Sequence, residues 1–228
     1  MKITVFGAGG ATGREVVTQA VAKGHDVRAS EFSFDGVEGL PEGIERVEAD
    51  VLSDDLRAVV AGSDAVLSCL GVGNDLATLS DPPPLYTDGT RGIVAAMAAE
   101  RISRLIVISA TFIDAPNRGP VLFRLGAETA LAKVFDQMEE MERILRDSDL
   151  DWTAVRPGWL MDGPATGDYA VRENAIPPGL IRARHADVAD LMLTCAETGD
   201  WSRKTPAIAR EEDGDDTSSL AVLREMLG

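Results

Sequence analysis

The chain has 228 residues, 45% of them apolar, and a formal net charge of −16. This length suits one large α/β domain, and the negative charge argues against a nucleic-acid or anionic-membrane partner, because both require basic surfaces. No stretch approaches the roughly 18 apolar residues of a membrane span, the N-terminus does not resemble a signal peptide, and Cys69 and Cys195 have no metal-binding spacing. We therefore expect a cytoplasmic protein that acts on a small molecule, with Cys69 as a buried thiol.

The first predicted element is a strand that ends in a glycine-rich turn. Ile3, Val5 and Phe6 are apolar and suited to a strand, and residues 7–13 (GAGGATG) follow directly. A helical pattern of apolar residues then runs to Gly24, which is expected to end the helix. Strand, glycine turn and helix in this order form the context that a dinucleotide-phosphate loop requires.

Each glycine of this turn has a physical role in such a loop. Gly7 lets the chain leave the strand in a conformation that a Cβ would forbid. Gly9 and Gly10 carry no side chain that would hold a pyrophosphate away, and Gly13 lets the helix pack close to the sheet. The helix N-terminus supplies unpaired N–H groups and a partial positive charge.

Two other interpretations of the turn remain open. The spacing Gly7-x-x-Gly10-x-x-Gly13 is not the strict G-x-G-x-x-G pattern, so the segment could be only a tight βα turn. Thr12 and Glu15 also fit the spacing of a helix-capping box.

Strands and helices alternate along most of the remaining chain. Strands are expected at residues 25–31, 44–49, 64–70, 104–109, 151–155 and 205–209, with a short one near Tyr169. Helices are expected at residues 53–60, capped by Ser53, and at 86–101, 129–147, 185–197 and 217–227. Residues 71–84 are expected to form a long loop, residues 110–130 an irregular lid, and residues 211–216 an acidic loop.

This alternation predicts an α/β fold with a doubly wound parallel sheet of the Rossmann type. We expect one domain over residues 1–228. Residues 1–155 would form the cofactor half, and residues 156–228 a small C-terminal substrate-side cap with a terminal helix. Ligands of such sheets lie beyond the carboxyl ends of the strands, so the residues that follow each strand are the candidates for a site.

Several segments, in this order along the chain, carry a resemblance to a known family. They are the glycine turn and residues 49–51 (ADV), 63–66 (SDAV), 73–76 (GNDL), 89–94 (GTRGIV), 105–109 (LIVIS), 148–158 (SDLDWTAVRPG) and 185–190 (HADVAD). Over about residues 1–200 the chain resembles the NAD(P)H-binding atypical short-chain dehydrogenases. The most similar branch is the flavin reductase/biliverdin-IXβ reductase group, and NmrA-like proteins are also similar.

The resemblance implies a cofactor site at matching positions. These are Gly7, Gly9, Gly10, Ala11, Thr12 and Gly13 at the pyrophosphate, Asp50 and Val51 at the adenine, Leu70 and Gly71 at the adenosine and ribose, and Pro157, Gly158 and Trp159 beside the nicotinamide. It also implies that Ser109 is the catalytic serine near the nicotinamide and substrate. Asp50 could instead be a helix cap or turn residue, and Ser109 could be a strand-end serine that bonds its own backbone.

The end of the second strand differs from the pattern of the family. The family often places an arginine there to hold the 2′-phosphate of NADP, whereas this chain has Glu31. An acidic residue at this place favours a free 2′-hydroxyl and repels a phosphate, which favours NAD(H) over NADP(H). Glu31 could also be an exposed loop carboxylate, and Arg28 could reach a 2′-phosphate only if it points outward.

The family's Tyr-x-x-x-Lys pair, which supplies the proton for carbonyl reduction, is absent. Neither Tyr86 nor Tyr169 precedes a lysine by four residues, and the equivalent positions fall near Val134 and Met138. Ordinary carbonyl reduction and sugar epimerisation are therefore not expected. A conjugated acceptor such as a flavin, quinone or tetrapyrrole needs less help, because its proton can come from water and the protein need only stack it on the nicotinamide.

Aromatic side chains near the predicted nicotinamide site are candidates for binding such an acceptor. Phe112 and Trp159, with Phe123, could wall the substrate pocket, or they could belong to ordinary core or lid packing. His185 is interpreted as a helix cap or surface residue, and His25 has no expected role. The sequence thus predicts an NAD(P)H-dependent reductase without bound metal. The alternative is a non-catalytic NAD(P)-binding sensor of the NmrA-like type, and the oligomeric state stays open.

Overall fold

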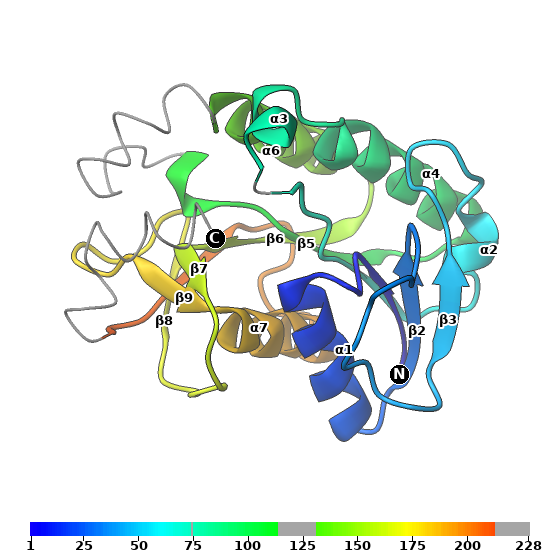
Figure 1. Cartoon of the computed structure of the whole chain (residues 1–228), viewed down its shortest axis with the longest axis horizontal. Coiled ribbons are helices and arrows are strands. Elements are labelled where there is room, and N and C mark those ends of the chain that lie inside the picture. Colours follow the sequence, from blue (N-terminus) through cyan, green and yellow to red (C-terminus); the bar gives the residue numbers. More distant parts are fainter. Residues whose placement is uncertain (74, 114–130, 213–228) are drawn as a thin grey trace.

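A computed structural model describes residues 1–73, 75–113 and 131–212, which are built around one twisted sheet (Figure 1). The described strands follow the order β3-β2-β1-β4-β5-β6-β10-β8. Their bounds are β1 Lys2–Phe6, β2 Asp26–Glu31, β3 Glu45–Glu48, β4 Ala65–Ser68, β5 Arg104–Ile108, β6 Asp151–Pro157, β8 Ala170–Glu173 and β10 Pro206–Ala209. Neighbouring strands are parallel except β10 and β8. The predicted doubly wound parallel fold is confirmed.

Helices cover both faces of this sheet. Helices α1 (Ala11–Ala22) and α7 (His185–Thr198) lie on one face, and α2 (Arg57–Val60), α4 (Thr90–Glu100) and α6 (Ala132–Asp147) lie on the other (Figure 1). Each layer has its own apolar core, and side chains at helical spacing form it on the helix side. The central strands are buried on both faces, so they are apolar throughout rather than alternating.

Strand β1 lies at the point where the order of strands reverses. The chain passes from β1 outward to β2 and β3, and then returns to place β4 on the other side of β1. At this switch point Gly7 has a φ of +69°, and a Cβ on it would lie 2.6 Å from the carbonyl oxygen of Cys69. Glycine is therefore required where β1 and β4 diverge. The Cys69 thiol is buried as expected, and burial raises its pKa to about 12.

The expected helix at residues 53–60 and the expected loop at residues 71–84 were partly wrong. Helix α2 begins only at Arg57, because Ser53 does not cap a helix but donates to the Asp50 carboxylate in a turn, at 3.0 Å. The loop contains a short helix, α3 (Leu76–Ser80), whose first turn is capped by Asp75. Both elements are too short to show a helical period.

The helix expected from residue 86 starts differently, and two short strands were missed. A π-helical turn, Leu85–Gly89, precedes α4. Strands β7 (Trp159–Met161) and β9 (Arg182–Arg184) form a separate two-stranded parallel sheet. Three-residue strands leave too little alternation to recognise in a sequence.

The C-terminal part of the chain extends the main sheet as well as forming the small one. Strand β10 pairs with β6, and α7 packs along α1. The division into a cofactor half and a substrate-side cap therefore stays an interpretation. Part of the expected lid with Phe123, the end of the acidic run and the predicted terminal helix lie outside the described residues. Within the described ranges no helix is both long and apolar enough to cross a membrane.

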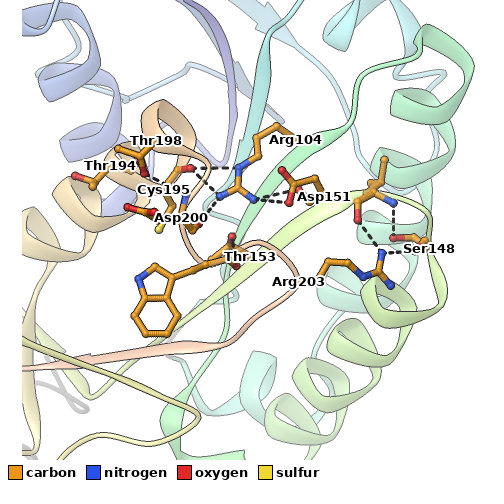
Figure 2. Close-up of polar contacts among 11 residues, drawn as sticks. Arg104, Ser148, Asp151, Thr153, Thr194, Cys195, Thr198, Asp200 and Arg203 are labelled. Carbon is orange, nitrogen blue, oxygen red and sulfur yellow. Dashed lines mark hydrogen bonds and ion pairs between the residues drawn. The ribbon is translucent and has the colours of Figure 1, made fainter.

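Two arginines cap helices at the amino-terminal edge of the sheet (Figure 2). Arg104, which is 6% exposed, donates to the carbonyl oxygen of Cys195 at 2.7 Å and to that of Asp200 at 3.0 Å, at the end of α7. Arg203 donates to the carbonyl oxygens of Ser148 and Arg146, at the end of α6. The guanidinium groups thus bind carbonyl oxygens at and just beyond the C-terminal ends of α7 and α6, where a positive charge complements the helix dipole.

Candidate functional site: a dinucleotide-phosphate loop and a buried serine network

The glycine turn leads straight into α1 at the carboxyl edge of the sheet. Gly10 is the N-cap residue, and the N–H of Arg14 makes the first helical hydrogen bond, to the carbonyl oxygen of Gly10 at 2.9 Å. The amides of Ala11, Thr12 and Gly13 come before this bond, so they have no acceptor within the helix. They carry the positive end of the helix dipole and form a place for an anion.

Gly13 and Gly10 are needed for different reasons. A Cβ on Gly13 would lie 2.0 Å from the carbonyl oxygen of Gly7, so only glycine lets α1 approach the loop this closely. A Cβ on Gly10 would meet its nearest neighbour, the same oxygen, at 3.4 Å, which is an ordinary contact. Gly13 therefore serves packing, whereas Gly10 leaves room beside the unpaired amides. The capping-box interpretation of Thr12 was wrong, since the cap is Gly10.

The Glu31 carboxylate lies against the glycine loop. Its Oε2 accepts a hydrogen bond from the Gly9 N–H at 2.8 Å, and its Oε1 accepts one from the Phe32 N–H at 3.0 Å. The side chain is half-buried, so it is not merely an exposed loop residue. On the other side of Gly9, Arg14 donates to the Gly9 carbonyl oxygen at 2.7 Å. A carboxylate therefore ends β2, where the ribose of a dinucleotide would lie.

Arg28 does not point toward this site. It is 8% exposed and donates to the carbonyl oxygens of Val59 at 2.6 Å and Ala61 at 3.0 Å, at the end of α2. Its Nε also forms an ion pair with Glu45 at 2.9 Å. The guanidinium is held beneath α2. Arg28 therefore does not point outward, as it would have to do to reach a 2′-phosphate.

The residues predicted to contact the adenine, Asp50 and Val51, lie where the turn after β3 packs against Leu70 and the residue before α4. The Asp50 carboxylate accepts the N–H of Leu52 at 2.9 Å and so holds its own turn; a contact with adenine stays a prediction. Val51 is 9% exposed, and a Cβ on Gly89 would lie 3.1 Å from its side chain and 3.4 Å from that of Leu70. The sequence alone did not single out Gly89, although it lets the start of α4 close over both residues.

Tyr86 is a second residue that sequence reasoning missed. It lies in the π-helical turn and is 5% exposed. Burial raises the pKa of its phenol to about 12, and a hydrogen bond with the Val72 backbone opposes this rise. A Cβ on Gly71 would be 3.9 Å from the phenol oxygen. Tyr86 thus supports the chain just after β4, where the predicted ribose-contacting residues lie. The sequence analysis considered Tyr86 only as a member of a Tyr-Lys pair, and no local spacing indicates this supporting role.

Ser109 directly follows β5. It lies in a buried network with two charged side chains. The serine is 2% exposed, and its hydroxyl donates to Oε1 of Glu142, on α6, at 2.7 Å. Arg156, on β6, donates to both oxygens of the same carboxylate, at 2.8 and 2.6 Å. Glu142 is 1% and Arg156 3% exposed. The Ser109 hydroxyl uses its one donor in the hydrogen bond to Glu142, so it has only lone pairs left for other partners.

The residues at the usual Tyr-Lys positions are apolar. Val134 is 5% and Met138 8% exposed, and both belong to the core between α6 and the sheet. Glu142 lies on the same helix, one turn beyond Met138. This helix therefore presents a buried carboxylate to Ser109 and no proton donor at the expected positions.

Phe112 and Trp159 meet just beyond β5 and β6, with a third ring. Phe112 lies with its centroid 6.2 Å from that of Phe135 and 6.4 Å from that of Trp159, and both pairs are tilted. Phe112 is 5% exposed, whereas Trp159 and Phe135 are half-buried. A Cβ on Gly158 would lie 2.5 Å from the Ile181 carbonyl oxygen, so glycine after Pro157 lets the chain pass close to β9. These rings form an apolar wall beyond the carboxyl ends of β5 and β6, and their contact with a substrate stays a prediction.

His185 lies beside the glycine loop, not on a remote surface. It is the first residue of α7, after the N-cap Arg184. Its Nδ1 is 2.7 Å from the Thr12 hydroxyl. The structure thus brings together two residues that the sequence analysis treated separately, one in the predicted phosphate loop and one interpreted as a cap.

Comparisons with known proteins agree with this geometry. A family model described as NAD(P)H-binding matches residues 7–198. A Streptomyces 3-diazoavenalumate denitrifying reductase is 32% identical over 183 residues, covering 73% of this chain and 58% of that protein. The chain spans less than two thirds of the length of the first curated relatives it matches, 63% and 58%.

Solved structures share the fold at low sequence identity. A Streptococcus pneumoniae protein assigned as an NADH-flavin reductase superposes with a TM-score of 0.73 at 21% identity, over 92% of this chain and 100% of that one. A Veillonella parvula short-chain dehydrogenase/reductase in complex with NADP gives 0.75 at 16% identity, over 96% and 98%. The chain shares its fold with this short-chain dehydrogenase/reductase structure, and from the glycine loop to the end of α7 it belongs to the NAD(P)H-binding family.

Proposed function

We propose that this protein is an NAD(P)H-dependent reductase of a conjugated acceptor, such as a flavin, a quinone or a tetrapyrrole, and that it prefers NAD(H). The single observation that carries the proposal is the first turn of α1. There, three amides without a helical acceptor surround the space left open at Gly10. This arrangement fits a pyrophosphate, and it lies at the switch point where dinucleotides bind in such sheets.

The preference for NAD(H) follows from Glu31. Its carboxylate is fixed by the Gly9 N–H at 2.8 Å, and Arg28 is turned away under α2. A carboxylate accepts hydrogen bonds from ribose hydroxyls and repels a 2′-phosphate. Arg14 is the cation nearest to Gly9 among the described contacts, but its guanidinium is bound to the Gly9 carbonyl oxygen.

The conjugated acceptor follows from the chemistry around Ser109. The bound dihydronicotinamide would supply a hydride, that is, two electrons and one proton, and leave as NAD(P)⁺. At the three positions considered for proton transfer, the described residues offer no acid: Ser109 donates to Glu142, and Val134 and Met138 are apolar. An acceptor that is already electron-poor can take its second proton from water. The protein's part would be to hold its plane against the aromatic wall of Phe112, Phe135 and Trp159.

Stopped-flow loss of NADH absorbance tests this proposal. We expect oxidation of NADH with flavin or quinone acceptors and none with simple ketones or nucleotide sugars. Titration with NADH and NADPH in the absence of acceptor should show tighter binding of NADH. If a broad acceptor panel gave no turnover while the cofactor bound, the reductase proposal would fail.

A second candidate, a non-catalytic NAD(P)-binding sensor, is favoured by the same Ser109 network. A serine whose proton is committed to a buried carboxylate suits a structural role as well as a catalytic one. A sensor should bind oxidised and reduced cofactor with similar affinity and should retain a protein partner in pull-down experiments. A reductase should show turnover with at least one acceptor class, so the two candidates differ in a direct measurement.

A further inference from the structure

The contact between His185 and Thr12 joins the two helices that share one face of the sheet. The two residues are 173 positions apart in the chain, and the Nδ1–Oγ1 distance is 2.7 Å. A second contact, from the Gln19 side-chain amide to the Ala186 carbonyl oxygen at 2.9 Å, fixes the register of α1 against α7. His185 is thus held at the second residue of α1, within the turn that carries the unpaired amides.

The direction of this hydrogen bond decides what Thr12 can offer a ligand. A hydroxyl has one proton to donate and two lone pairs. If the Nδ1 of His185 lacks a proton, Thr12 donates to it, and the proton is no longer available. If Nδ1 carries the proton, His185 donates to Thr12, and the hydroxyl proton of Thr12 is free for an acceptor beside the Ala11 and Gly13 amides.

Phosphate oxygens are such acceptors, and hydrogen bonds to them are among the strong ones. Thr12 is only 6% exposed, so its hydroxyl proton has few alternative partners. The carboxylate in the first turn of α7, Asp187, is directed elsewhere: it accepts the N–H of Thr166 at 2.7 Å and its hydroxyl at 2.8 Å.

We propose that His185 is a positioning residue of the pyrophosphate site: it donates from Nδ1 to Thr12, whose hydroxyl then donates to a pyrophosphate oxygen of the cofactor. This inference rests on the proposed binding of a dinucleotide and adds a side-chain relay to the backbone cradle. It also gives a role to a residue that the sequence analysis interpreted only as a helix cap or surface residue.

The protonation of Nδ1 can be observed directly. The chain has two histidines, and His25 lies at the opposite edge of the sheet, with its Nε2 bound to Glu197 at 2.7 Å. We would record imidazole ¹⁵N spectra with and without ADP-ribose, which contains the pyrophosphate but no nicotinamide. With ADP-ribose bound, Nδ1 of His185 should have the shift of a protonated nitrogen, and the His25 signals should not move. An unprotonated Nδ1 in the complex would overturn the relay.

A double-mutant cycle tests the same relay by affinity. We expect His185→Ala and Thr12→Val each to weaken ADP-ribose binding about tenfold, and the double variant to be no weaker than either single one, because both break one chain of hydrogen bonds. His185→Asn, which can keep a donor near the Nδ1 position, should recover most of the affinity. His25→Ala is the matched control and should bind normally. Additive losses, or normal binding by a folded His185→Ala protein, would overturn the inference.

The reductase proposal and the His185 relay can be refuted independently of each other. ADP-ribose cannot be oxidised or reduced at a nicotinamide, so its binding does not depend on catalysis. Wild-type protein that binds ADP-ribose with the expected His185 signature but never oxidises NADH would refute the reductase and leave the relay standing. Normal NADH turnover together with an unaffected His185→Ala variant would refute only the relay.

Discussion

The carboxyl edge of the sheet carries two regions built on opposite principles. At the glycine loop, the expected contacts to a ligand come from backbone amides, and the absence of a side chain on Gly10 leaves space beside the amides of residues 11–13. At the end of β5, charged side chains are buried together: Ser109, Glu142 and Arg156 are at most 3% exposed. The first region relies on backbone groups, which suit the dinucleotide expected of the NAD(P)H-binding family. The second depends on the identity of its three side chains. Cofactor binding and chemistry should therefore respond to different substitutions.

The largest effect is expected from removing the Glu142 carboxylate. Glu142→Ala leaves Arg156 buried without its bidentate partner, and breaking such a pair costs about 3–5 kcal/mol of unfolding free energy. Urea denaturation would measure this loss. The double variant Glu142→Leu with Arg156→Met should recover much of it, because two apolar side chains need no partners. Glu139→Gln, on the exposed side of the same helix, is the control and should be nearly neutral. A stable Glu142→Ala protein would show that the network is not a structural unit.

The glycine loop should respond in affinity rather than in stability. Gly10→Val places methyl groups beside the first-turn amides, and its Cβ would meet nothing closer than an ordinary contact. We expect the unfolding midpoint to change little and NADH affinity to fall at least about 100-fold, which is about 2.7 kcal/mol. Fluorescence titration with NADH measures this. Normal binding by folded Gly10→Val would refute the assignment of the phosphate cradle.

Cofactor preference should depend on Glu31. In Glu31→Gln the charge that repels a 2′-phosphate is gone, while an amide oxygen can still accept the Gly9 N–H. We expect the ratio of NADH to NADPH affinity to fall about tenfold, or about 1.4 kcal/mol. Parallel titrations with both cofactors check this, and Glu48→Gln, at the end of the neighbouring strand, serves as the control. An unchanged ratio would show that Glu31 only holds the loop.

The smallest effect is expected at the ion pair between Glu45 and Arg28, in the cofactor half. The guanidinium of Arg28 holds the pKa of Glu45 below its ordinary value of 4.5. A lowered pKa stabilises the fold above about pH 4.5, and this stabilisation is lost as the pH falls through the folded-state value. Because Glu45 is half exposed, Glu45→Gln should cost less than about 1 kcal/mol at pH 7. Urea denaturation at pH 7 and pH 3 should show that the difference from wild type shrinks in acid.

The same contrast explains which parts could be predicted from the sequence. The glycine loop is a local pattern of strand, turn and helix within residues 2–22, so its fold followed from the order of residues, and its part in a cofactor site stays a prediction. The Ser109 network joins residues from β5, α6 and β6, and no spacing indicates that Glu142 rather than Tyr or Lys reaches the serine. The contact of His185 with Thr12 spans 173 positions and depends on how α7 packs against α1. Ser53 was misread as a cap because Asp50 captures its hydroxyl in a turn.

The arginine cap at the far end of α7 has a consequence for the site. Arg104, at the start of β5, binds the carbonyl oxygens of Cys195 in this helix and of Asp200 just beyond it (Figure 2). His185 begins the same helix at the glycine loop. A helix of 14 residues is about 21 Å long and resists bending along its axis. Helix α7 is therefore held by hydrogen bonds at both edges of the sheet, at His185 and at Cys195. Its length and its contact with Arg104 help to place the imidazole at the loop, so under the proposed relay a substitution of Arg104 should change the affinity of the loop from the opposite side of the molecule.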